Sequence, residues 1–69
     1  MNIGDMITVD PDILGGTPVF KGTRVPVKAL FENLEDGARI DDFLEWFPGV
    51  TPRQVEVVLQ HAERSLTVA

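Results

Sequence analysis

Three cations in the first half of the chain are the clearest candidates for contact with a polyanion. Lys21, Arg24 and Lys28 lie within residues 18–31, a segment without Asp or Glu, so its local charge is +3 although the whole chain carries −5. Cationic side chains without acidic neighbours are suited to phosphate contacts. These three residues are therefore the first candidates for a DNA-binding surface.

A second, weaker set of candidates lies near the start of the last expected helix. Arg53 suits guanine, Gln54 suits adenine, and Val57 could meet a thymine methyl group. The simpler interpretation is a mixed solvent face, because scattered charges and single exposed apolar side chains are common on protein surfaces. Arg53 and Gln54 stay as secondary DNA-binding candidates beside that interpretation.

Residues 32–45 carry the opposite charge. Six carboxylates oppose one cation in this segment, which gives it a net charge of −5. Asp41, Asp42 and Glu45 share one face of an expected helix and Trp46 follows them, so these four are candidates for contact with a basic partner protein. A solvated face whose first turn favours negative charge explains the acids equally simply. Trp46 is equally well explained as part of a small core.

The chain shows no convergent set of residues that indicates an active site. His61 is the single histidine and Cys is absent, which excludes a thiolate nucleophile and cysteine-based zinc sites. The run from Gly16 to Thr23 resembles a phosphate-binding loop, but its Lys and Gly are transposed. The carboxylates of residues 41–45 lack the supporting residues of a Mg²⁺ site. We expect a protein without catalytic residues, metal or cofactor.

The elements that position these residues begin with short strands. Residues 6–9 favour a short β-strand, which is expected to end at the turn-forming residues Asp10-Pro11-Asp12. Residues 19–20 and 24–25 flank a segment in which Gly22 can adopt the positive φ of a tight turn, so the two pairs are expected to form a hairpin. Strands of this length must pack on helices or pair with another chain.

Three helices are expected to follow, each marked by apolar residues three and four positions apart. The first begins near Pro26 and ends at Gly37, and the second spans about two turns before a Pro-Gly pair. Thr51 caps the third helix, and Gln54 can complete a capping box. The apolar stripes are Val27, Leu30, Phe31 and Leu34; then Ile40, Phe43, Leu44 and Phe47; then Val55, Val58, Leu59, Ala62 and Leu66.

This order of elements predicts a mainly α fold, with a short N-terminal β hairpin followed by a trihelical helix-turn-helix bundle of the homeodomain-like kind. Residues 1–69 are expected to form a single domain, with a β segment at 6–26 and a three-helix bundle at 27–66. A chain of this size buries only about 60% of its unfolded surface, so a homo-oligomer, most simply a dimer, is expected. No membrane-spanning segment is expected, and the cytoplasm is the expected location.

A set of short motifs runs through the chain: Ile7-Thr8-Val9-Asp10-Pro11, Gly15-Gly16-x-Pro18-Val19, Lys21-Gly22-Thr23-Arg24-Val25-x-Val27, Gly37, Phe47-Pro48, Val50-Thr51 and Ala62. Together they resemble domain-of-unknown-function family 433, the VapB-type antitoxin-like proteins. The resemblance implies a small bacterial or archaeal helix-turn-helix protein with an N-terminal β segment. It also implies an oligomer that neutralises a PIN-like ribonuclease toxin and represses its own operon.

These observations leave two functional hypotheses. In the first, the chain is a non-enzymatic antitoxin that neutralises a PIN-like toxin and binds operator DNA, with Lys21, Arg24 and Lys28 on phosphates. In the alternative, it is a protein-interaction module that does not bind DNA and acts through its acidic face and Trp46.

Overall fold

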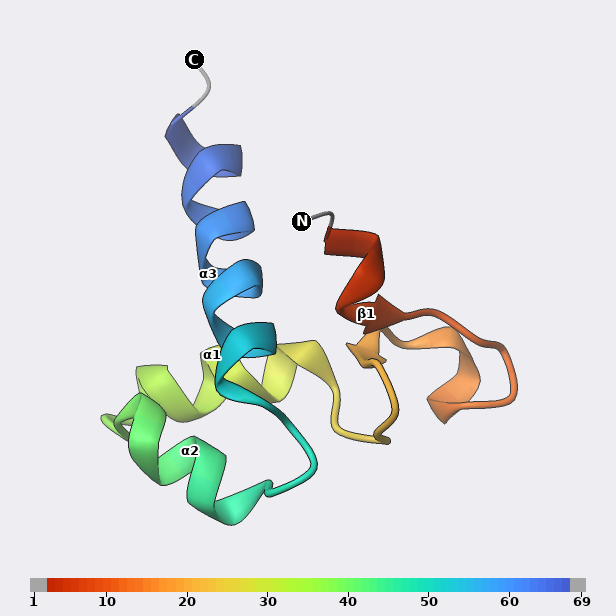
Figure 1. The fold of residues 1–69 in the computed structure, drawn as a ribbon, viewed down its shortest axis with the longest axis horizontal. Coiled ribbons are helices and arrows are strands. Elements are labelled where there is room, and N and C mark those ends of the chain that lie inside the picture. Colours follow the sequence, from red (N-terminus) through yellow and green to blue (C-terminus); the bar gives the residue numbers. More distant parts are fainter. Residues whose placement is uncertain (1–2, 68–69) are drawn as a thin grey trace.

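A two-stranded antiparallel sheet forms the N-terminal part of the computed structural model, which describes residues 3–67 (Figure 1). Strand β1 (Ile7–Thr8) pairs with β2 (Val19–Phe20), with Ile7 opposite Phe20. Two short 3₁₀ helices flank β1, η1 (Ile3–Asp5) before it and η2 (Leu14–Gly16) after it. Three helices follow the sheet, so the prediction of an N-terminal β hairpin ahead of three helices is confirmed.

The pairing within the sheet differs from the sequence-based expectation. The strand expected at residues 6–9 is present as β1, but it is β1 that pairs with β2. Residues 24–25 add one backbone hydrogen bond to β2, from the Phe20 N–H to the Val25 carbonyl (3.0 Å), and the Val27 N–H donates to the Pro18 carbonyl (3.0 Å) on the other side of an isolated bridge between Val19 and Pro26. Because α1 begins at Val27, the pairing on that side stops at this bridge. The partner of β2 is therefore the earlier strand.

The turn between β2 and the first helix is fixed by backbone geometry and one hydroxyl group. Gly22 has a φ of 82°, which residues with a Cβ adopt only with strain. The Thr23 hydroxyl donates to the Phe20 carbonyl (2.7 Å) and accepts from the Val25 N–H (3.0 Å). We call residues 21–25 the β2 turn.

The three helices begin and end close to their predicted positions: α1 (Val27–Glu35), α2 (Ile40–Trp46) and α3 (Pro52–Thr67). Helix α1 starts directly after Pro26, and Gly37, with a φ of 93°, follows its end. At the start of α2, the Asp42 carboxylate accepts the Arg39 backbone N–H at 3.0 Å. Local capping therefore sets where these helices begin and end.

The core lies where β2 meets the three helices. Its buried members are Phe20, Leu30, Phe43, Val50, Val55 and Val58. The ring centroids of Phe20 and Phe43 are 6.1 Å apart, and those of Phe43 and Phe47 are 4.8 Å apart, distances typical of favourable aromatic pairs. Phe43 thus joins the sheet to α2 at the centre of the core.

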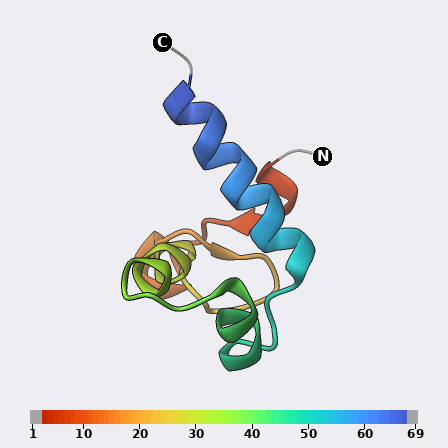
Figure 2. The same cartoon turned by 90° about the vertical axis from the view of Figure 1, so that its left-hand side faces the viewer.

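Helix α3 runs past the rest of the molecule, and its last turns extend away from the other helices in both views (Figures 1 and 2). Leu66, expected in the apolar stripe of α3, is consequently 87% exposed. Val57, expected on the outward face, is instead 7% exposed because η1 packs against α3. Within residues 3–67, no helix combines the length and apolar character needed to cross a bilayer.

Candidate functional site

The three cations of the first DNA-binding candidate set lie on one connection between elements. Lys21 and Arg24 belong to the β2 turn, Lys28 belongs to the first turn of α1, and all three side chains are exposed. We call these three residues the basic surface. The structure thus leaves their charges accessible to a partner from solvent.

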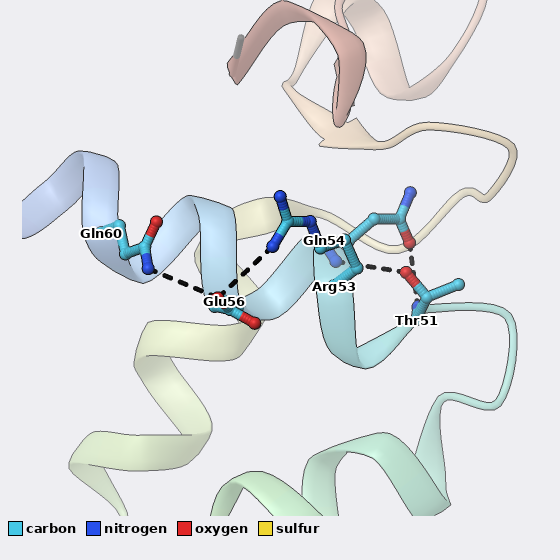
Figure 3. A network of polar contacts seen from close by, with 5 residues as sticks. All are labelled: Thr51, Arg53, Gln54, Glu56 and Gln60. Carbon is cyan, nitrogen blue, oxygen red and sulfur yellow. Dashed lines mark hydrogen bonds and ion pairs between the residues drawn. The ribbon is translucent and has the colours of Figure 1, made fainter. Parts of the chain in front are cut away.

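Gln54 bonds to Thr51 at the start of α3 (Figure 3) and also connects this helix to the β2 turn. Its amide Nε2 donates to the Lys21 carbonyl at 3.0 Å, and its Oε1 accepts the Thr51 N–H at 2.9 Å. The Gln54 N–H in turn donates to Thr51 Oγ1 at 3.1 Å, so the predicted capping box is confirmed. The side chain is 8% exposed and both ends of its amide are engaged. In this conformation Gln54 stabilises the fold and does not present its amide to a base.

A close backbone approach strengthens the same junction. A Cβ atom built on Gly49, in the connection between α2 and α3, would lie 3.3 Å from Thr23 Cγ2. Few real Cβ contacts are that short, so this connection packs tightly against the β2 turn. The first turn of α3 is therefore held against the β2 turn, which carries Lys21 and Arg24, by a hydrogen bond and by close packing.

Arg53, the other secondary DNA-binding candidate, lies beside this junction but shares its charge with an acid. Its Nη1 is 3.4 Å from Glu56 Oε1, and Gln60 Nε2 contacts the same oxygen at 3.4 Å (Figure 3). Both charged side chains are about half exposed, so the ion pair contributes little stability. The outward face of α3 near its start is therefore close to neutral.

The candidates on α2 divide into two groups. Asp42 is half-buried and caps the helix, which is sufficient reason for an acid at that position. Asp41 and Glu45 are exposed and lie one turn apart, and Trp46 is 57% exposed at the end of the helix. The exposed Trp46 is not part of the intramolecular core, so the explanation that places it there is wrong.

A groove of about 380 Å³ lies between α2 and α3. Ile40 and Leu44 of α2, together with Val55 and Leu59 of α3, give it an apolar floor. We call this feature the α2–α3 groove. The sequence alone does not indicate the groove, because all four residues fit the apolar helical spacing that is typical of core positions. Asp41 directly after Ile40 is a signal that Ile40 lies at the polar edge of its helix face.

The border of the α2–α3 groove carries three carboxylates, of which Glu56 is the ion-pair partner of Arg53 described above. Asp41, Glu56 and Glu63 line it, and neither Lys nor Arg is among its described lining residues. The fold thus places a carboxylate of α2 near two carboxylates of α3 that are more than a dozen residues away in sequence. This surface combines exposed apolar area with negative charge.

Catalytic and metal-binding arrangements find no support in the described part of the chain. His61 is exposed, and its backbone carbonyl accepts the Ser65 hydroxyl at 3.0 Å. Among residues 3–67, no three His, Cys, Asp or Glu side chains gather closely enough to hold a metal ion. The basic surface and the α2–α3 groove are the two candidate binding features that the described residues present most clearly.

Comparison with known proteins finds a family match that covers the basic surface and every lining residue of the groove except Glu63. A family model described as "Protein of unknown function (DUF433)" matches residues 7–62. "Uncharacterized protein y4eO" of Sinorhizobium fredii (strain NBRC 101917 / NGR234) is 37% identical over 59 residues, which are 86% of this chain and 27% of that protein. The chain thus spans about a quarter of the length of this relative. No solved structure matches the chain.

Proposed function

The chain belongs to the DUF433 family, and we propose that it is a non-enzymatic antitoxin that neutralises a PIN-like ribonuclease by binding it through the acidic surface of α2 and α3. The observation that carries this proposal is the α2–α3 groove. Its floor is apolar, and all the charged residues that line it are carboxylates. Enzymes that act on RNA need cationic surface for the phosphates, and such a surface is complementary to an acidic one.

Two further exposed residues of α2 lie near this surface. Glu45 lies one turn after Asp41, which borders the groove, whereas Trp46 is largely exposed at the end of the helix and projects from a different side of α2 than Ile40 and Leu44. Exposed aromatic side chains are frequent anchors in protein interfaces, while charges at the border raise the rate and selectivity of encounter. A folded surface of this kind can occlude a nuclease active site without any chemistry of its own.

The test is co-expression with the product of the adjacent open reading frame, followed by a ribonuclease assay. We expect a stable complex that survives size-exclusion chromatography and a nuclease activity that falls in proportion to added protein. Trp46→Ala should weaken the complex at least tenfold, whereas Val9→Ala, which removes an exposed apolar side chain elsewhere, should not. Recovery of both proteins as separate species, with full nuclease activity, would contradict the proposal.

A second candidate function, operator DNA binding, is favoured by the basic surface. Lys21, Arg24 and Lys28 are exposed and come from a segment without acids. Dimerisation, which we also propose, would double this cationic area and match a two-fold symmetric operator. Base reading by α3 has less support, because Gln54 and Val57 are buried. We therefore assign the basic surface to phosphate contacts that carry little sequence information.

Charge reversal tests this second function. Arg24→Glu should weaken DNA binding by a similar factor on every DNA sequence. It should also reduce the slope of log K against log salt concentration by roughly one. Arg39→Glu is the matched control, since Arg39 is an exposed cation at the start of α2. Binding should be measured by fluorescence anisotropy across a salt series. Equal effects of both variants would move the DNA contact away from the basic surface.

A further inference from the structure

The α2–α3 groove leaves apolar side chains in contact with water. Ile40 is 39% exposed, and Leu44 and Leu59 are each only partly buried. On a chain this small, each apolar side chain that stays exposed lacks the stabilisation that its burial would provide. Grouping of such side chains in one concave site is a mark of an interaction surface rather than of scattered exposure.

Resting on the function proposed above, we infer that the α2–α3 groove receives an amphipathic helix of the basic partner. That helix inserts two apolar side chains one turn apart and places Lys or Arg against the acidic border. The groove's volume, about 380 Å³, suits a few side chains rather than a folded domain. Its walls are two helices, the arrangement that proteins use to hold an amphipathic helix by anchors at i and i+4.

Hydrogen bonding also favours this occupant. Among the described residues, no buried side-chain nitrogen or oxygen lacks a hydrogen-bond partner. The polar groups that line the groove are the border carboxylates and the Gln60 amide, which already contacts Glu56 Oε1 at 3.4 Å, so a small polar molecule would meet mainly apolar floor and negative charge. Recognition must come from apolar burial at the centre and opposite charge at the edge, which a basic amphipathic helix supplies together.

Charge argues against a second copy of this chain as the occupant. Helix α1 carries Lys28 but also the exposed Glu32 and Glu35, and both other helices contribute carboxylates to the groove itself. A helix of another copy would therefore bring acids to an acidic border, and like charges at an interface are repulsive. The complementary helix must come from a different, basic protein.

The first experiment uses synthetic helical peptides as probes. A fluorescent peptide with Leu at i and i+4 and flanking Lys should bind the full chain. A version with Glu in place of Lys should bind at least tenfold more weakly, and replacement of both Leu by Ser should abolish binding. Equal binding of the Lys and Glu peptides, or no binding of the Lys peptide, overturns the inference.

Variants of the chain then locate the contact. Ile40→Ser should lower the affinity for the Lys peptide at least tenfold. The double variant Asp41→Asn with Glu56→Gln should lower this affinity by a similar factor and also make it less dependent on salt. The controls are Val9→Ser and the pair Asp12→Asn with Glu35→Gln, all exposed positions away from the groove. Circular dichroism confirms that each variant is folded. Loss of binding in the controls, or retention in the groove variants, contradicts the assigned site.

A pull-down with the adjacent nuclease separates this inference from the function on which it rests. If wild type and Ile40→Ser both capture the nuclease equally, the antitoxin function stands and the groove is not its contact. If the Lys peptide binds the groove but no nuclease complex forms, the groove chemistry stands and the antitoxin function falls. Self-association of wild type that Ile40→Ser abolishes in sedimentation would identify a second copy as the occupant and overturn the inference.

Discussion

At the scale of single residues, Gln54 shows how one side chain can be assigned two incompatible roles. Its position near the start of a helix suits base recognition, and its spacing from Thr51 suits a capping box. The structure uses it for the cap and adds a hydrogen bond to the Lys21 carbonyl, 33 residues away in sequence. The capping box was predictable from the spacing of Thr51 and Gln54. The burial of Gln54 was not predictable, because the Lys21 carbonyl comes from a distant segment.

Truncation of Gln54 should therefore lower stability. Gln54→Ala removes the acceptor for the Thr51 N–H and the donor to the Lys21 carbonyl, so we expect a loss of about 1–2 kcal/mol in the free energy of unfolding. The measurement is urea or thermal unfolding followed by circular dichroism. Gln60→Ala, on the exposed side of the same helix, should change stability by less than about 0.5 kcal/mol. Equal losses in the two variants would show that the contacts of Gln54 are not stabilising.

At the scale of elements, the helices were predictable and the sheet was not. Apolar spacing and local caps determine where α1, α2 and α3 begin and end, and these signals lie within or next to each helix. The pairing of β1 with β2 joins segments that a long loop separates. Two-residue strands also carry little periodic pattern, so the sequence favoured residues 24–25, the nearer segment, as the partner of β2. The helix that begins at Val27 leaves residues 24–26 room for only a single bridge, between Val19 and Pro26.

The candidate site divides in the same way. The exposure of Lys21, Arg24 and Lys28 could be expected from the turn-forming residues around them. The α2–α3 groove could not, because it depends on how far apart two helices pack, and each helix alone shows only an apolar stripe. Local features of the surface were therefore predictable, whereas the concave one required the tertiary structure.

The β2 turn provides the prediction for this scale. Gly22→Ala places a Cβ at a φ of 82°, so we expect a loss of about 1–2 kcal/mol although nothing lies within 4 Å of that Cβ. Gly22→Asn should lose less, because Asn tolerates positive φ better than Ala. Unfolding curves of the two variants distinguish backbone strain from crowding. A larger loss for Asn than for Ala would indicate that side-chain size, rather than φ, limits this position.

At the scale of the whole molecule, stability depends on a very small core. The chain measures 34 × 28 × 20 Å along its principal axes, and a domain of this length rarely has more than about 3–5 kcal/mol of stability from one core. Phe43 is fully buried at its centre, in contact with the rings of Phe20 and Phe47. The loss of that one ring is therefore comparable to the entire stability of the fold.

Phe43 substitutions test this. Phe43→Ala should cost about 3–5 kcal/mol and leave the isolated chain largely unfolded at 25 °C. Phe43→Leu, which keeps most of the apolar volume, should stay folded with a lower melting temperature. Helix content by circular dichroism and chemical-shift dispersion by NMR provide the measurements. A cooperative, native-like Phe43→Ala variant would mean that the core extends beyond the described cluster, for example across an oligomer interface.

In the complex proposed above, the acidic border of the α2–α3 groove and its apolar floor act at different stages of the encounter. Carboxylates at the edge attract and orient a basic partner over distances of about a Debye length, so they set the association rate and make it fall with salt. Ile40 and Leu44 act only after contact, when water has left the groove, and so set how long the complex lasts. A partner held this way finds the protein quickly at low ionic strength, while its residence time depends on two leucine-sized side chains.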